Sequence, residues 1–144
     1  MKTKAPPKTR VFLVEDHQIV RQGLARLINM EADLKVCGEA SNASDALAQI
    51  PALKPDLVLT DISMSGMNGI EFLKHLKARY PEMPAVVLSM HDEAHYAERA
   101  FRAGALAFVM KRESTDEMLA ALRKARCGEH HVSERVGKRI FQLF

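Results

Sequence analysis

Residues 57–61, Leu-Val-Leu-Thr-Asp, form a short apolar run that ends in an aspartate. A similar run at residues 11–14, Val-Phe-Leu-Val, is followed directly by Glu15 and Asp16. Continuous apolar runs of this kind are typical of parallel strands that are buried on both faces of a sheet. Open α/β sheets bind their ligands at the carboxyl ends of such strands. We therefore expect the three acidic side chains to gather at one edge of a parallel sheet.

Apolar runs and helical patterns alternate along the rest of the chain, which predicts βαβ units around a parallel sheet. The predicted strands are Val11–Val14, Lys35–Ala40, Asp56–Thr60, Ala85–Ser89 and Ala105–Met110. Pro51 predicts the end of the second helix, and Ser114 and Glu117 have the spacing of a capping box at the start of the fifth. The fold predicted is a small, doubly wound α/β domain.

The last part of the chain has a different character. Val132, Val136 and Ile140 recur at every fourth residue, which predicts a further amphipathic helix within residues 132–144. The chain stops on an apolar cluster at residues 140–144, and a folded monomer seldom leaves such a cluster exposed. We expect this segment to pack on another chain or to be followed by a further one.

The composition is that of one ordinary domain in a reducing compartment. The chain has 144 residues, 47% of them hydrophobic, and a net charge of +3 that lies largely in residues 1–10. We interpret residues 1–8 as a flexible basic tail, so the charge does not indicate nucleic-acid binding by the folded part. Cys37 and Cys127 form no metal or redox motif, and no apolar run approaches the ~20 residues of a membrane span. The prediction is a cytoplasmic protein with no membrane contact.

The polar residues at the strand ends suit phosphoryl chemistry. Asp16 and Asp61 could bind Mg²⁺, which prefers oxygen ligands, while Glu15 holds a metal-bound water. Asp61 could then attack a phosphoryl donor, since carboxylates form acyl-phosphate intermediates. Two later strands end in Ser89 and Lys111. The ammonium would neutralise the transferred group and the hydroxyl would donate a hydrogen bond to it.

The stretches that carry these residues resemble the response-regulator receiver domain, the CheY-like phosphoacceptor fold. The resemblance lies in residues 11–17, in the loop at residues 57–69, and in the strands at residues 87–89 and 105–111; it covers about residues 9–128. Ser65 departs from the proline that this family usually has in the loop. The resemblance implies a (βα)5 domain with a five-stranded parallel sheet in the order 2-1-3-4-5.

It also implies a role for each site residue. Asp61 would be the phosphoacceptor. The Mg²⁺ (or Mn²⁺) ligands would be Asp16, Asp61, the backbone carbonyl of Ser63 and, through water, Glu15. Lys111 would bind the phosphate. Ser89 would be the switch hydroxyl and Phe108 the switch aromatic, which turns inward when Ser89 bonds the phosphoryl group. The domain would be a switch rather than an enzyme, with at most slow self-catalysed phosphorylation and dephosphorylation.

Residues 11–17, 20–24, 125–128 and 132–133 are similar to the NarL/FixJ (LuxR-type) branch of transcriptional regulators. In that branch a short helical linker joins the receiver to a helix-turn-helix DNA-binding domain. The resemblance implies a receiver at 9–128 and a linker at 129–144, with the DNA-binding domain absent from this chain. It further implies phosphorylation by a sensor histidine kinase, homodimerisation on phosphorylation, and DNA contact only through the missing domain.

The sequence leaves three alternative functions open. A stand-alone receiver that signals by protein contact would have the same site residues. A haloacid-dehalogenase-like phosphohydrolase would need a second aspartate at position 63, where this chain has Ser63. A flavodoxin-like flavin binder would need a phosphate-binding loop after the first strand, where Glu15 and Asp16 would repel a phosphate instead.

Overall fold

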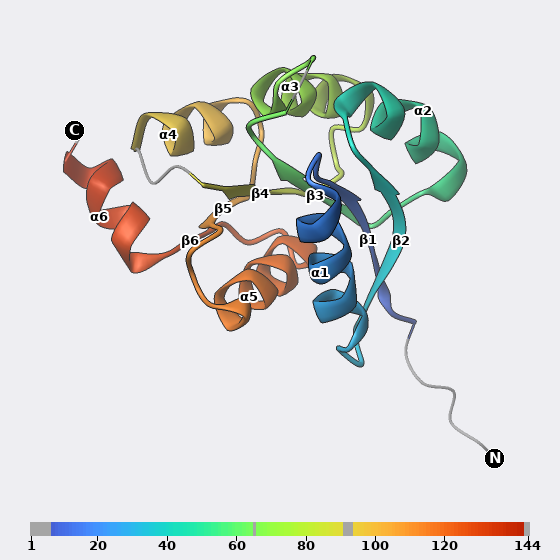
Figure 1. Ribbon diagram of the computed structural model, residues 1–144. Helices are drawn as coiled ribbons and strands as arrows, with labels where there is room; N and C mark the ends of the chain where they lie inside the picture. Colours follow the sequence, from blue (N-terminus) through green and yellow to red (C-terminus); the bar gives the residue numbers. More distant parts are fainter. Residues whose placement is uncertain (1–6, 65, 91–93, 143–144) are drawn as a thin grey trace.

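A parallel sheet lies between two layers of helices in the computed structural model, which describes residues 7–64, 66–90 and 94–142 (Figure 1). The strands are β1 (Thr9–Val14), β2 (Leu34–Ala40), β3 (Leu57–Asp61), β4 (Ala85–Ser89), β5 (Ala107–Met110) and β6 (His131–Val132). The helices are α1 (Gln18–Asn29), α2 (Ala43–Leu53), α3 (Gly69–Arg79), α4 (Ala94–Arg102), α5 (Thr115–Arg126) and α6 (Glu134–Gln142). The predicted doubly wound α/β fold is confirmed.

Some of the predicted features fall outside the described residues. They are the basic tail up to residue 6, Ser65, and the apolar end of the chain at residues 143 and 144.

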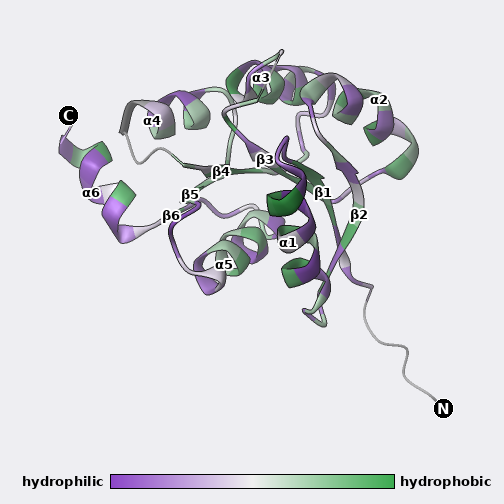
Figure 2. Cartoon of the chain, viewed as in Figure 1, coloured by the Kyte–Doolittle hydropathy of each residue, from purple (hydrophilic) through white to green (hydrophobic). Residues whose placement is uncertain are grey.

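Each face of the sheet carries its own hydrophobic core. Helices α2, α3 and α4 cover one face, where Phe12, Phe72 and Phe108 are fully buried. Helices α1 and α5 cover the other face, over Leu13 and Leu59. Apolar residues line the strands and polar residues the outer sides of the helices (Figure 2). Within the described part of the chain, no helix has the length and apolar character that a membrane span requires.

Over the described residues the sheet has six strands, in the order β2-β1-β3-β4-β5-β6, so the prediction of five was wrong. The additional strand, β6, pairs in parallel with β5, with Val132 opposite Phe108. It supplies hydrogen-bond partners to an edge that β5 would otherwise leave open. Consequently, the helix predicted for residues 132–144 begins only at Glu134. Its Val136 is fully buried, and α6 packs against α4.

The end of the second helix and one bond of the predicted capping box also differ from the structure. Helix α2 continues past Pro51 to Leu53, because the missing N–H of Pro51 costs one bond and the ladder resumes with Lys54 N–H donating to the Ile50 carbonyl at 2.9 Å. Only half of the capping box forms. The Ser114 hydroxyl accepts from the Glu117 N–H at 3.2 Å, but the Glu117 carboxylate contacts His131 of β6 instead of reaching back.

Candidate functional site

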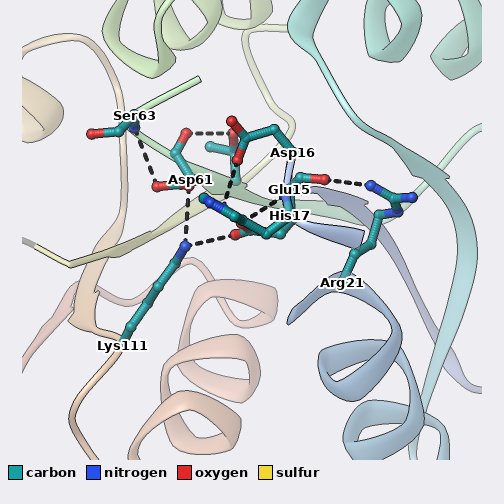
Figure 3. Close-up of polar contacts among 8 residues, drawn as sticks. Glu15, Asp16, His17, Arg21, Asp61, Ser63 and Lys111 are labelled. Atoms are coloured by element: carbon teal, nitrogen blue, oxygen red, sulfur yellow. Dashed lines mark hydrogen bonds and ion pairs between the residues drawn. The ribbon is translucent and has the colours of Figure 1, made fainter. Parts of the chain in front are cut away.

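The carboxyl ends of three strands bring the predicted polar residues together. Glu15 and Asp16 follow β1, Asp61 ends β3 and Lys111 follows β5; their side chains converge at one edge of the sheet (Figure 3). Because β1 and β3 are neighbours in the sheet, the acidic pair lies beside Asp61. The clustering predicted from the apolar runs is confirmed.

Lys111 joins the two most deeply buried carboxylates. Its Nζ lies 2.8 Å from Glu15 Oε2 and 3.1 Å from Asp61 Oδ2, and the three side chains are 11%, 1% and 4% exposed. Burial acts to lower the pKa of Lys111, but its hydrogen bond to Glu15 and the charge of Asp61 outweigh burial and raise that pKa. Lys111 is therefore held as an ammonium ion in the site.

The carboxyl of Asp61 is costly to ionise in this position. Burial raises its pKa; the charge of Lys111 opposes that shift and the charge of Glu15 adds to it. One ammonium faces three carboxyl groups, so the site has an excess of negative charge that a bound cation would relieve.

Asp16 is the acidic residue of the site with an unused ligand atom. Its Oδ1 is buried and has no hydrogen-bond partner; His17 Nδ1 lies 3.1 Å away but without hydrogen-bonding geometry. Single ligand atoms of Glu15, Asp16, His17 and Asp61 all lie within 4.8 Å of one another. A set dominated by carboxylate oxygens, one of which accepts no hydrogen bond, fits a hard divalent cation such as Mg²⁺.

Ser63 and Gly69 shape the loop after Asp61. The Ser63 N–H donates to Asp61 Oδ1 at 3.2 Å. The Gly69 N–H donates to the Ile62 carbonyl at 2.8 Å, and an added Cβ on Gly69 would lie 2.5 Å from the Asp61 carbonyl oxygen. Only glycine permits helix α3 to begin this close to the site.

The two predicted switch residues lie on β4 and β5. Ser89 ends β4 with 1% of its surface exposed, and its carbonyl accepts from the Lys111 N–H at 2.7 Å. Phe108 is fully buried on the α4 face of the sheet, in the same core cluster as Val136 of α6.

Arg21 contacts the site although the prediction gave it no role there. It is on α1, and its Nη1 donates to the backbone carbonyl of Glu15 at 2.7 Å (Figure 3). Its sequence signal was present but ambiguous, since an arginine one turn into an amphipathic helix is usually solvated.

The chain has clear sequence relatives. Residues 11–123 match the family model of the response regulator receiver domain. The chain is 40% identical over 118 residues to the transcriptional regulatory protein UhpA of Salmonella typhimurium, covering 82% of this chain and 59% of that protein. It is 36% identical over 124 residues to the nitrate/nitrite response regulator protein NarL of Escherichia coli K12, covering 86% and 57%. The chain spans between 56% and 62% of the length of the curated relatives it matches.

Solved structures agree with this similarity. A LuxR-family two-component response regulator from Aurantimonas sp. SI85-9A1 superposes with a TM-score of 0.91 at 30% identity, over 94% of this chain and 97% of that one. The signal receiver domain of a NarL response regulator from Mycobacterium tuberculosis gives a TM-score of 0.81, also at 30% identity, over 86% of this chain and 100% of that one.

Proposed function

Because this chain belongs to the family of response regulator receiver domains of the NarL/LuxR type, we propose that Asp61 accepts a phosphoryl group from a sensor histidine kinase. The observation that carries the proposal is the position of Asp61, buried at a strand end and bonded to Lys111 beside two further acids. Family membership decides against the flavin-binding and phosphohydrolase alternatives.

The transfer requires an ionised carboxylate and a leaving group that accepts a proton. A carboxylate oxygen of Asp61 attacks phosphorus, a P–O bond forms, and the P–N bond to the kinase histidine breaks. The electron pair returns to the imidazole nitrogen, which then takes up a proton. The Lys111 ammonium neutralises charge on the phosphoryl oxygens, and Ser89 donates a hydrogen bond to the product. The same residues would support at most slow self-catalysed phosphorylation and dephosphorylation.

The residues that would hold Mg²⁺ (or Mn²⁺) are Asp16, Asp61 and the Ser63 carbonyl, with Glu15 acting through a water. The buried Oδ1 of Asp16, which accepts no hydrogen bond, supports this assignment. When bound, the cation supplies positive charge that offsets both the carboxylates and the incoming phosphoryl group.

Phosphorylation would change the conformation of the domain's signalling surface through Ser89 and Phe108. Phosphorylation adds negative charge and acceptor oxygens at Asp61, and these draw the Ser89 hydroxyl towards the phosphoryl group. The surface around Phe108, including α4 and the β6–α6 segment, would then repack as one of two states. In a longer parent protein this change would control dimerisation and the DNA binding of an effector domain, and so transcription. UhpA, a named transcriptional regulatory protein, supports this extension.

Phosphotransfer in a purified system tests the proposal. An autophosphorylated sensor histidine kinase is mixed with the chain in Mg²⁺ and in EDTA, and label is followed on both proteins. We expect transfer only with Mg²⁺, none to Asp61→Asn, and a higher Mg²⁺ requirement for Asp16→Asn. Asp116→Asn, which changes an exposed acid on α5, is the matched control and should behave as wild type. Transfer to Asp61→Asn at the wild-type rate would exclude Asp61 as the acceptor.

A further inference from the structure

Arg21 holds the backbone of the acidic turn from the side of helix α1. Its Nη1 donates to the Glu15 carbonyl at 2.7 Å, and its Nε lies 3.6 Å from Glu39 Oε1 on β2. Its side chain is 19% exposed, so most of the guanidinium is enclosed between α1 and β2. Figure 3 shows it reaching the turn from the side opposite Lys111.

Other contacts restrain the backbone N–H and the carboxylate of Glu15. Its N–H donates to the Ala40 carbonyl at 3.0 Å, and its carboxylate is bound by Lys111 at 2.8 Å. The His17 N–H also donates to Glu15 Oε1 at 3.3 Å. Arg21 adds a restraint on the carbonyl that begins the peptide bond to Asp16.

The Asp16 carboxylate has one contact of its own, because His17 Nδ1 lies 3.1 Å from Asp16 Oδ1 without hydrogen-bonding geometry. Its Oδ1 is buried without a hydrogen-bond partner. The direction in which Asp16 points is therefore set by the backbone of the turn together with the exposed His17 side chain. Groups that orient metal ligands in this indirect way typically change metal affinity 10–100-fold when they are removed.

We propose that Arg21 is a positioning residue for the cation site: by fixing the Glu15 carbonyl it keeps the Asp16 carboxylate aimed at the metal position. The proposal rests on the divalent-cation binding that is part of the proposed function. It is distinct from a simple charge effect, which has the opposite sign. A guanidinium close to a cation site repels the cation, so its removal would tighten binding if charge alone mattered.

The test measures Mg²⁺ affinity by isothermal titration calorimetry on Arg21→Gln, Arg21→Lys and Arg26→Gln. We expect Arg21→Gln to bind Mg²⁺ about 10-fold or more weakly than wild type. Arg21→Lys keeps the positive charge but loses the planar guanidinium, so its Mg²⁺ affinity should lie between that of wild type and that of Arg21→Gln. Arg26→Gln removes an exposed charge from the same helix and should bind as wild type. Unchanged or tighter binding by Arg21→Gln overturns the proposal.

A second readout separates positioning from general loss of stability. Urea unfolding is followed with and without Mg²⁺, and the stabilisation by Mg²⁺ is compared between variants. A residue with only a structural role lowers both curves and leaves the Mg²⁺ increment unchanged, which would also overturn the proposal. Asp16→Asn is measured in parallel. If it binds Mg²⁺ as tightly as wild type, the cation site of the proposed function fails, whatever the result at Arg21.

Discussion

Lys111→Met removes a positive charge that contacts both buried carboxylates of the site, Glu15 and Asp61, while keeping a side chain of similar length. In the folded protein Glu15 is 1% exposed and Asp61 is 4% exposed, and Lys111 Nζ lies within 3.1 Å of both. Without Lys111, the buried carboxylates of Glu15 and Asp61 would lie close together without the ammonium ion that they share. We expect a large loss of stability in Mg²⁺-free buffer at pH 7.

The size of the loss follows from this burial. Breaking a buried ion pair by removing one partner costs about 3–5 kcal/mol. A domain of this size is stable by only about 5–15 kcal/mol, so the variant should remain folded but with much of its stability gone. With a urea m-value of about 2 kcal/mol/M, the unfolding midpoint should fall by about 2 M.

Urea unfolding monitored by far-ultraviolet circular dichroism measures this loss for Lys111→Met, Asp61→Asn and the double variant. Adding Asp61→Asn removes one of the two orphaned charges, so the double variant should recover a substantial part of the loss. The pKa of Lys111 is raised above its ordinary value of 10.5. Its stabilisation is therefore complete below pH 10.5 and is lost as the pH rises through the folded-state pKa. A loss under about 1 kcal/mol, the range of surface pairs, would refute the reasoning.

Three further substitutions, Asp61→Asn, Gly69→Ala and Val136→Ala, are compared with wild type by urea unfolding. The pKa of Asp61 is raised above 3.8 in the folded chain, so protonation favours folding below pH 3.8 and that benefit is lost as the pH rises through the folded-state pKa. Asp61→Asn should therefore be more stable than wild type at pH 7, and the difference should disappear in acid; equal stability at both pH values would contradict this. Gly69→Ala places a Cβ 2.5 Å from the Asp61 carbonyl oxygen, so it should lower the free energy of unfolding by about 1–3 kcal/mol and slow phosphorylation. An unchanged free energy of unfolding would mean that the loop backbone shifts to accommodate the Cβ at no cost. Val136→Ala, fully buried in α6, should cost about 2 kcal/mol within a single transition; a separate early transition would show that α6 unfolds independently.

The features that the sequence predicted well share one cause. Buried parallel strands are continuous apolar runs, and β3 and β4 are buried at every position. Since all such strands end at one edge, the sequence alone predicts that Asp61, Glu15 and Lys111 meet there. The geometry of the parallel sheet therefore determines where the site residues lie.

The features that were missed depend on contacts between distant segments. Val132, Val136 and Ile140 all pack against the same core cluster, so their spacing by four fits the burial of all three. Spacing does not reveal that Val132 reaches that core from a two-residue strand and the other two from a helix. The second bond of the capping box is missing for a similar reason, because His131 of that strand contacts the Glu117 carboxylate at 2.7 Å.

The contact between Arg21 and Glu15 could not be predicted from residue types alone. The partner of Arg21 is a backbone carbonyl, and every residue has one, so no residue type at position 15 could have signalled the contact. Only the fold shows that the Glu15 carbonyl lies within hydrogen-bonding distance of the Arg21 guanidinium.

The central claim is that Asp61 carries the phosphoryl group, and mapping the modified residue tests it most directly. The chain is incubated with acetyl phosphate and Mg²⁺, digested under acidic conditions, and the phosphorylated peptide is sequenced by tandem mass spectrometry. The account predicts one acid-stable, base-labile phosphoryl group on Asp61 and none in Asp61→Asn. A phosphoryl group on another residue of the wild-type chain, or equal labelling of Asp61→Asn, would contradict it.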